Sequence, residues 1–387
     1  MERRRMIYFD NAATTFPKPR AVGQEIWNCV TRYGGNPGRG AHTLSLAAAE
    51  KIFSCRCLAA ELLGVEEPER VFFTLNTTYA LNTVLKGLLR PGDHVILSDL
   101  EHNAVYRPLY KMEQEGRITT SVFRSMVGDP ARTPTRICAG IARLIRPETR
   151  MVVCVHSSNL CSAVMPIREI GAFCHRHGLL FVVDAAQSAG HEPISVDGMN
   201  IDALCVPGHK GLYGPQGCGL VALGKEVLPD SLVEGGNGFH SLEGSMPDFP
   251  PERFEAGTLP TPAIAGLCEG IRSVNQLGIE EISAYEKKLY RAMRERLRSI
   301  PEVTLYASEY EGAVLLFSVT GISPERVGQR LNDLGICVRS GYHCSALGHK
   351  TLGTPEGGGI RVSFGIYNQL FEVDQMEQAL RRIIREG

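Results

Sequence analysis

Short apolar runs alternate with amphipathic stretches of helical period from about residue 70 to residue 225. They predict strands at 71–74, 94–98, 149–155, 180–184, 203–206 and 219–223, and helices at 77–89, 103–115, 134–145 and 166–177. Such alternation predicts an α/β fold, in which a mostly parallel sheet is covered by helices on both faces. Ligands of these folds bind beyond the carboxyl ends of the strands, so we expect the chemistry to lie there.

The remainder of the chain predicts a smaller α+β domain. A Gly- and Pro-rich stretch at 234–262 indicates a long functional loop followed by a domain boundary. Beyond it, helical patterns lie at 263–277, 280–299, 324–335 and 372–385, and strand-like runs at 313–319, 336–339 and 360–364. We therefore expect a large domain at 16–262 and a small domain made of 1–15 and 263–387.

Lys210 is the position that says most about the chemistry. It follows the predicted strand 203–206 within the glycine-rich turn Gly208-His-Lys-Gly-Leu-Tyr-Gly. A lysine that loses solvation is shifted toward the neutral amine, which forms Schiff bases with carbonyls and with pyridoxal phosphate (PLP). Asp184 ends the preceding strand, and a carboxylate there can keep the pyridine nitrogen of PLP protonated. The alternatives are a buried structural ion pair and an exposed loop lysine.

Other polar side chains follow other predicted strands. Thr77 and Thr78 open a helix, where free amides and hydroxyls suit a phosphate group, although plain helix capping is the alternative. His102 could stack on a planar cofactor and relay protons, or it could be structural. Asn159 could donate a hydrogen bond to a phenolate oxygen.

Cys344 lies in the segment Arg339-Ser-Gly-Tyr-His-Cys-Ser, which predicts an exposed loop. Exposure and the adjacent His343 favour a thiolate, which is a good nucleophile. Because the chain has 12 cysteines, an incidental thiol is the alternative. Arg361 lies in a short predicted strand and is suited to bidentate binding of a substrate carboxylate, although an ordinary arginine at the edge of the core would look the same.

Charge and composition disfavour several classes of protein. The net charge of −1 provides no global field that would attract nucleic acid or an anionic membrane. We expect a cytoplasmic protein, because no segment is long and apolar enough to cross a membrane and the start lacks the apolar stretch of a secretory signal. The cysteines contain no Cys-x-x-Cys spacing, so we expect reduced core thiols and no metal site.

The motifs, taken in order, resemble the cysteine desulfurases, NifS/SufS-like members of the class V aminotransferase group of fold type I PLP enzymes. The resemblance covers nearly the whole chain. It rests on Tyr8-Phe-Asp-Asn-Ala-Ala-Thr-Thr, Asn36-Pro-Gly-Arg-Gly-Ala-His42, Asn76-Thr-Thr, Glu101-His102, Ser158-Asn159, Val183-Asp-Ala-Ala-Gln187, Gly208-His-Lys210, Arg253-Phe-Glu-Ala-Gly-Thr258, Arg339-Ser-Gly-Tyr-His-Cys344 and Arg361. The Arg-x-Gly-x-His-Cys motif is closest to the SufS-type group. The resemblance implies a large PLP-binding domain with a seven-stranded type of sheet.

The resemblance also implies a role for each site residue. The cofactor-binding residues would be Thr77, Thr78, His102, Asn159, Asp184, Gln187, His209, Lys210 and Thr258. The substrate-binding residues would be Arg361, Asn36 and His42. The catalytic residues would be Lys210, His102 and Cys344. Thr258 would reach the phosphate of a neighbouring subunit, which implies a homodimer with shared active sites.

The activity that the resemblance implies is conversion of L-cysteine to L-alanine, with a persulfide formed on Cys344 for an unidentified sulfur-acceptor protein. Three positions depart from the family pattern. Pro207 stands where a hydroxyl residue often helps to bind phosphate, Tyr79 where an acidic residue is frequent, and Ser162 where glycine is frequent.

Several alternatives stay open at this point. A selenocysteine lyase would use nearly the same residues. A cysteine C–S lyase or an aminotransferase would keep Lys210 and Asp184 but would not need Cys344. A sulfur carrier or partner-binding protein of the same fold would need no turnover, although the presence of Lys210 counts against it.

Overall fold

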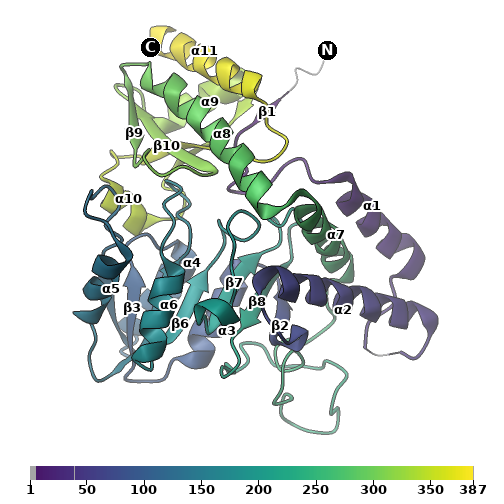
Figure 1. Ribbon diagram of the computed structural model, residues 1–387. Helices are drawn as coiled ribbons and strands as arrows, with labels where there is room; N and C mark the ends of the chain where they lie inside the picture. Colours follow the sequence, from purple (N-terminus) through teal and green to yellow (C-terminus); the bar gives the residue numbers. More distant parts are fainter. Residues whose placement is uncertain (1–5, 39, 387) are drawn as a thin grey trace.

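The computed structural model describes residues 6–38 and 40–386, so residues 1–5 of the predicted small domain lie outside the described residues. The chain forms a large layered part and a smaller part that sits against one end of it (Figure 1).

The large part is built on a seven-stranded sheet. Its order is β2 (Val71–Thr74), β8 (Gly219–Leu223), β7 (Ala203–Pro207), β6 (Leu180–Asp184), β5 (Thr149–Val155), β3 (His94–Ser98) and β4 (Thr119–Phe123). The strands from β7 to β4 are parallel, and β8 is antiparallel to both of its neighbours. The predicted α/β class with a mostly parallel sheet is confirmed.

Helices cover both faces of this sheet (Figure 1). Strand β3 shows why, since Val95 and Leu97 join the core on one face and Ile96 joins the core on the other. The first face packs on α3 (Thr77–Leu88) and α4 (Asn103–Gln114). The second packs on α2 (Thr43–Leu63), α5 (Pro134–Ala142), α6 (Ile167–Arg176) and α7 (Thr261–Leu277). Helix α1 (Arg20–Asn28) packs on α7 and runs into a π-helix at Cys29–Tyr33.

The smaller part has a four-stranded antiparallel sheet and a core of its own. The strand order is β12 (Arg339–Gly341), β13 (Gly359–Ser363), β10 (Val314–Val319) and β9 (Val303–Tyr306). The helices of this part are α8 (Ile279–Arg298), α9 (Pro324–Asp333) and α11 (Leu370–Glu386), while α10 (Ala346–Leu352) packs Leu347 and Leu352 against the cores of the large part. Strand β1 (Ile7–Tyr8) pairs in parallel with β11 (Ile336–Cys337).

Helix α7 belongs by its packing to the large sheet. Its residues Ile264, Leu267 and Ile271 are buried in the core of the large part, although the predicted boundary after residue 262 assigns them to the small domain. The Gly- and Pro-rich loop precedes α7, and its composition suggested the boundary too early. The division into two domains remains a proposal, in which α7 moves to the large domain.

The segment before α1 joins the two parts. Asn11 donates from Nδ2 to the carbonyl oxygen of Ser363, 352 residues away and 3.1 Å distant. Thr14 donates from Oγ1 to the carbonyl oxygen of His209 at 3.0 Å, and Lys18 donates from Nζ to the same oxygen at 2.7 Å. The segment therefore ties the small sheet to the turn that carries Lys210.

Two kinds of feature are absent from residues 6–38 and 40–386. No helix in these ranges is long and apolar enough to span a membrane. The same ranges contain no group of three or more His, Cys, Asp or Glu side chains that could hold a metal ion.

Candidate active site

A cavity of about 340 Å³ lies at the carboxyl ends of the large sheet's strands and is closed by side chains of the smaller part. The predicted residues that line it are Thr77, Thr78, His102, Asn159, Asp184, Gln187, His209, Lys210, Cys344 and Arg361. They end or follow six different strands (β2, β3, β5, β6, β7 and β12) or, for Arg361, lie within β13, so the fold collects in one place positions that are spread through the sequence.

Three predicted residues lie elsewhere in this chain. Asn36, His42 and Thr258 are exposed and do not line the cavity. His42 caps helix α2, and its Nδ1 accepts from the backbone N–H of Ser45 at 3.3 Å. Thr258 precedes α7 in the long loop, and the role predicted for it requires a second subunit.

Lys210 and Asp184 lie at the ends of the adjacent strands β7 and β6. Burial lowers the pKa of Lys210 to about 8, an effect that the charge of Asp184 opposes and the charges of Arg361 and Arg339 reinforce. At pH 7 roughly a tenth of the amine is therefore neutral. Asp184 is buried, which raises the pKa of its carboxyl group, and its Oδ1 accepts from the backbone N–H of Ala186 at 2.9 Å.

Two of the residues that line the cavity carry unsatisfied polar atoms. Thr77 Oγ1 and His209 Nδ1 are buried without a hydrogen-bond partner among the described residues. Burial lowers the pKa of His209 to about 4, so its ring is neutral near pH 7. Thr77 begins helix α3, and the free amides of a helix N-terminus attract anions. Thr77, His209 and the start of α3 therefore offer donors for an anionic group such as a phosphate.

His102 presents a neutral ring to the cavity. Its Nδ1 accepts from the backbone N–H of Ala104 at 3.0 Å, which places the ring hydrogen on Nε2. Burial lowers its pKa to about 4, and the charge of Lys210 acts in the same direction. A neutral ring held in this way can stack on a planar group.

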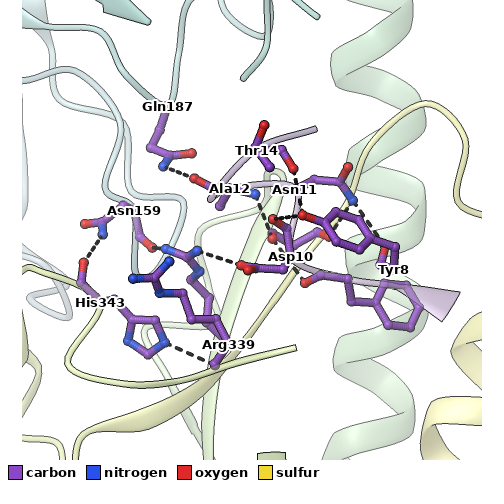
Figure 2. Close-up of polar contacts among 12 residues, drawn as sticks. Tyr8, Asp10, Asn11, Ala12, Thr14, Asn159, Gln187, Arg339 and His343 are labelled. Carbon is purple, nitrogen blue, oxygen red and sulfur yellow. Dashed lines mark hydrogen bonds and ion pairs between the residues drawn. The ribbon is translucent and has the colours of Figure 1, made fainter. Parts of the chain in front are cut away.

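Arg361 lines the cavity and uses only part of its hydrogen-bonding capacity in the described residues. It donates from Nη1 to the carbonyl oxygen of Asn159 at 3.2 Å and from Nη2 to Asp10 Oδ1 at 3.0 Å, while its buried Nε has no partner among the described residues (Figure 2). Asn159 in turn donates from Nδ2 to the carbonyl oxygen of His343 at 2.9 Å, and Gln187 donates to that of Ala12 at 2.9 Å. An unused guanidinium donor in a buried site suits a carboxylate.

Cys344 is the exposed thiol among the 12 cysteines of the chain. It lies between β12 and α10, and its backbone oxygen accepts from the N–H of Asn103 at 2.7 Å. The expectation that His343 favours the thiolate finds no support, because both nitrogens of that ring are engaged elsewhere. Nδ1 lies 3.2 Å from His349 Nε2, and Nε2 lies 3.2 Å from the carbonyl oxygen of Arg339.

The family described as aminotransferase class-V matches residues 7–376. The chain belongs to the class-V aminotransferases. It is 33% identical over 393 residues to a probable cysteine desulfurase from Methanothermobacter thermautotrophicus, with 98% of this chain and 95% of that protein covered. It is 35% identical to a probable cysteine desulfurase from Mycolicibacterium paratuberculosis, with 99% of this chain but only 56% of that longer protein covered.

A solved structure supports the same placement. The apo structure of a cysteine desulfurase from Thermococcus onnurineus superposes with a TM-score of 0.88 at 30% identity, covering 99% of this chain and 95% of that one. The predicted resemblance to cysteine desulfurases within the class-V aminotransferases is confirmed.

The cavity of this class-V aminotransferase fits the cofactor that its family implies, PLP. The unpartnered Thr77 Oγ1 and His209 Nδ1 suit the phosphate, and buried Asp184 suits a protonated ring nitrogen. Pro207 also lines the cavity and has neither a hydroxyl group nor an N–H to add.

The structure also places the other two departures from the family pattern, Tyr79 and Ser162. Tyr79 lies in the first turn of α3 and is exposed. Ser162 has φ of 54°, in the left-handed region, which explains why glycine is frequent there. Its Oγ donates to the carbonyl oxygen of Val314 at 2.8 Å and accepts from the N–H of Val314 at 2.8 Å.

Sequence reasoning assigned no role to three residues that shape the site. Asp10 pairs with Arg361, Arg339 lines the cavity, and His349 contacts His343. Asp10 and Arg339 lie inside the quoted motifs, which was the available signal. No spacing pattern marked His349.

Proposed function

We propose that this chain is a PLP-dependent cysteine desulfurase that converts L-cysteine to L-alanine and takes up the sulfur as a persulfide on Cys344. The observation that carries this proposal is that an exposed thiol, Cys344, and a lysine of lowered pKa, Lys210, line one cavity. The names of the relatives agree with it.

The cofactor would be held by the residues of the cavity. Thr77, Thr78 and His209 would bind the phosphate, and Asp184 the ring nitrogen. When bound, PLP supplies an electron sink that eases loss of the Cα proton and cleavage of the Cβ–S bond. Lys210 would carry the cofactor in the resting enzyme.

The side chains would act on the substrate in sequence. Arg361, which lines the cavity, holds the carboxylate through its guanidinium group. The neutral amine of Lys210 accepts the Cα proton. The Cys344 thiolate attacks the substrate sulfur, so that an S–S bond forms while the Cβ–S bond breaks and its electron pair stays with Cβ. Cβ takes up a proton and leaves as the methyl group of alanine, and the persulfide passes to a thiol of an acceptor protein.

We further propose that the enzyme is a homodimer. Apolar side chains of α1 and α2 are exposed in the single chain, including Trp27, Leu46 and Phe53. Helices α1 and α2 lie at the same edge of the molecule (Figure 1), and gathered exposed apolar side chains are typical of an interface. A second subunit placed there would provide an active site that Thr258, Asn36 and His42 of the first subunit could join.

The decisive experiment supplies L-cysteine to the purified holoenzyme and quantifies alanine, pyruvate and modified cysteines by mass spectrometry. We expect one alanine for each sulfur transferred and a persulfide on Cys344. Cys344→Ala should keep the bound cofactor and lose sulfur transfer, whereas Cys337→Ala, which removes a half-buried thiol, serves as the matched control.

Other outcomes would redirect the assignment. Pyruvate without a persulfide would indicate a C–S lyase. Activity on selenocysteine alone would indicate a selenocysteine lyase. Full sulfur transfer by Cys344→Ala would contradict the persulfide route.

A further inference from the structure

A chain of hydrogen bonds runs from the Cys344 turn to the end of α10. His343 Nε2 lies 3.2 Å from the carbonyl oxygen of Arg339, and its Nδ1 lies 3.2 Å from His349 Nε2. His349 Nδ1 lies 2.8 Å from Thr354 Oγ1. Both imidazole rings are buried, at 5% and 4% exposure, and they stack at 13° between their planes.

The hydrogen bond between His343 and Arg339 sets the donor and the acceptor of every other hydrogen bond in this series. A carbonyl oxygen can only accept, so His343 Nε2 carries a hydrogen and donates to Arg339 (Figure 2). Burial lowers the pKa of His343 to about 3 and that of His349 to about 4, so each ring carries one hydrogen near neutral pH. His343 Nδ1 must then accept from His349 Nε2, and His349 Nδ1 must accept from the hydroxyl of Thr354.

The alternative arrangement is disfavoured. The hydroxyl of Thr354 also lies 3.5 Å from the carbonyl oxygen of His349, at the limit of a hydrogen bond. If it donated there, His349 Nε2 would become an acceptor and face the acceptor Nδ1 of His343 across 3.2 Å. Thr354 therefore donates to His349 Nδ1, which supports the tautomer of His349 that donates from Nε2 to the His343 ring.

The turn that this chain supports is strained. His343 has φ of 51° and Cys344 has φ of 56°, both in the left-handed region. For a residue with a Cβ this conformation costs about 1–2 kcal/mol, and it persists only where the surroundings hold it. Asn159 and Asn103 hold the backbone oxygens of the two residues, and the His343 ring holds the carbonyl group of Arg339.

We propose that His349 and Thr354 are positioning residues that hold the strained His343–Cys344 turn, through the ring of His343, in the conformation that presents the Cys344 thiol to the cavity. The inference rests on the proposed function. It assigns His343 a structural task, because neither of its ring nitrogens is free to exchange a proton with the thiol or with a substrate.

Two pairs of variants in the holoenzyme test the proposal. His349→Leu removes the donor to His343, whereas His349→Gln can restore it, because the glutamine amide nitrogen can stand in for Nε2. Thr354→Val removes the hydroxyl at equal size, and Thr354→Ser keeps it.

Three readouts separate positioning from general damage. The first is the rate of persulfide formation on Cys344 in the first turnover with L-cysteine. The second is exchange of the Cα hydrogen of L-alanine in D₂O, which would need Lys210 and Arg361 but not Cys344. The third is the rate of alkylation of Cys344 by iodoacetamide, which needs no turnover.

For His349→Leu we expect persulfide formation to fall by roughly 10- to 100-fold, as a thiol displaced by about 1 Å would give, with a changed alkylation rate and unchanged Cα exchange. Thr354→Val should act in the same direction. His349→Gln and Thr354→Ser should recover most of the rate, and the pH profile of all four variants should keep the wild-type shape.

Three results would overturn the proposal. The first is a wild-type rate of persulfide formation in both His349→Leu and Thr354→Val. The second is a loss of Cα exchange that parallels the loss of persulfide formation. The third is the loss of one limb of the pH profile, which would mean that the histidines exchange protons in the reaction. Failure of the proposed function is distinguishable, since the wild type would then form no persulfide while the alkylation rates still report on the turn.

Discussion

Replacing Ser162 by glycine should destabilise the protein, although glycine is the more frequent residue at this position in the resembled family and the native φ is 54°. Glycine would relieve the strain of the left-handed conformation, which is about 1–2 kcal/mol. It would also give the unfolded chain more conformational freedom, which lowers the free energy of unfolding by about 0.5–1 kcal/mol. The hydroxyl of Ser162 forms hydrogen bonds with both the N–H and the carbonyl oxygen of Val314. Strand β9 does not pair with Val314, because it pairs with β10 only from Leu316 to Val319. Leaving two buried backbone groups unpaired costs about 1–3 kcal/mol each.

The hydrogen-bond loss exceeds the relief of strain, so Ser162→Gly should lower the free energy of unfolding by about 0.5–6 kcal/mol. An unfolding entropy of about 2.1 cal/mol/K per residue gives about 0.8 kcal/mol/K for 387 residues, so the Tm should fall by about 1–8 °C. Calorimetry or fluorimetry on the apoprotein measures this. Ser162→Ala, which loses the bonds and keeps the strain, should fall further. A glycine variant as stable as the wild type would refute the reasoning.

Three further predictions concern the cavity and its support. Burial lowers the pKa of Lys210 to about 8, so reconstitution of the apoprotein with PLP should speed up about tenfold per pH unit below that value and then level off; a rate independent of pH would contradict this. Asp184→Asn should raise the Kd for PLP by about 10- to 100-fold in an absorbance titration, and an unchanged Kd would remove its role. Arg56→Met should destabilise the fold by about 3–5 kcal/mol, because it leaves the buried Glu255 carboxylate without its bidentate partner at 2.9 Å. Adding Glu255→Leu should restore much of the lost stability, which denaturant unfolding measures.

The strands of the large sheet could be predicted because burial on both faces makes them continuous apolar runs. The expected strands at 71–74, 94–98 and 180–184 agree with β2, β3 and β6. Strand β4 was missed, since an edge strand of sequence Thr-Thr-Ser-Val-Phe is partly exposed and carries little apolar signal. Helix α2 was missed because it exposes Leu46 and Phe53, which blurs the helical period.

The candidate site could be predicted where chemistry-bearing residues end a strand, as Asp184 does, or closely follow one, as Lys210 does. The contacts of Asp10 and His349 could not be, because they join segments whose distance in sequence carries no information about their distance in space. The pairing of Asp10 with Arg361 spans 351 residues, and the parallel bridge between Asp10 and Ser363, at the end of the strand that carries Arg361, brings the two together.

The bridging segment before α1 has a consequence for the order in which the protein matures. Ile7 and Tyr8 have no strand partner until residues 336–337 exist, and Asn11 has neither Ser363 nor Asn368 until the chain is almost complete. On the ribosome, the large sheet can assemble early from contiguous strands, and Thr14 and Lys18 can bind His209 before the small sheet exists. We expect the cavity to be among the last features to close, so that cofactor capture follows synthesis of the C-terminal third and a truncated nascent chain stays colourless.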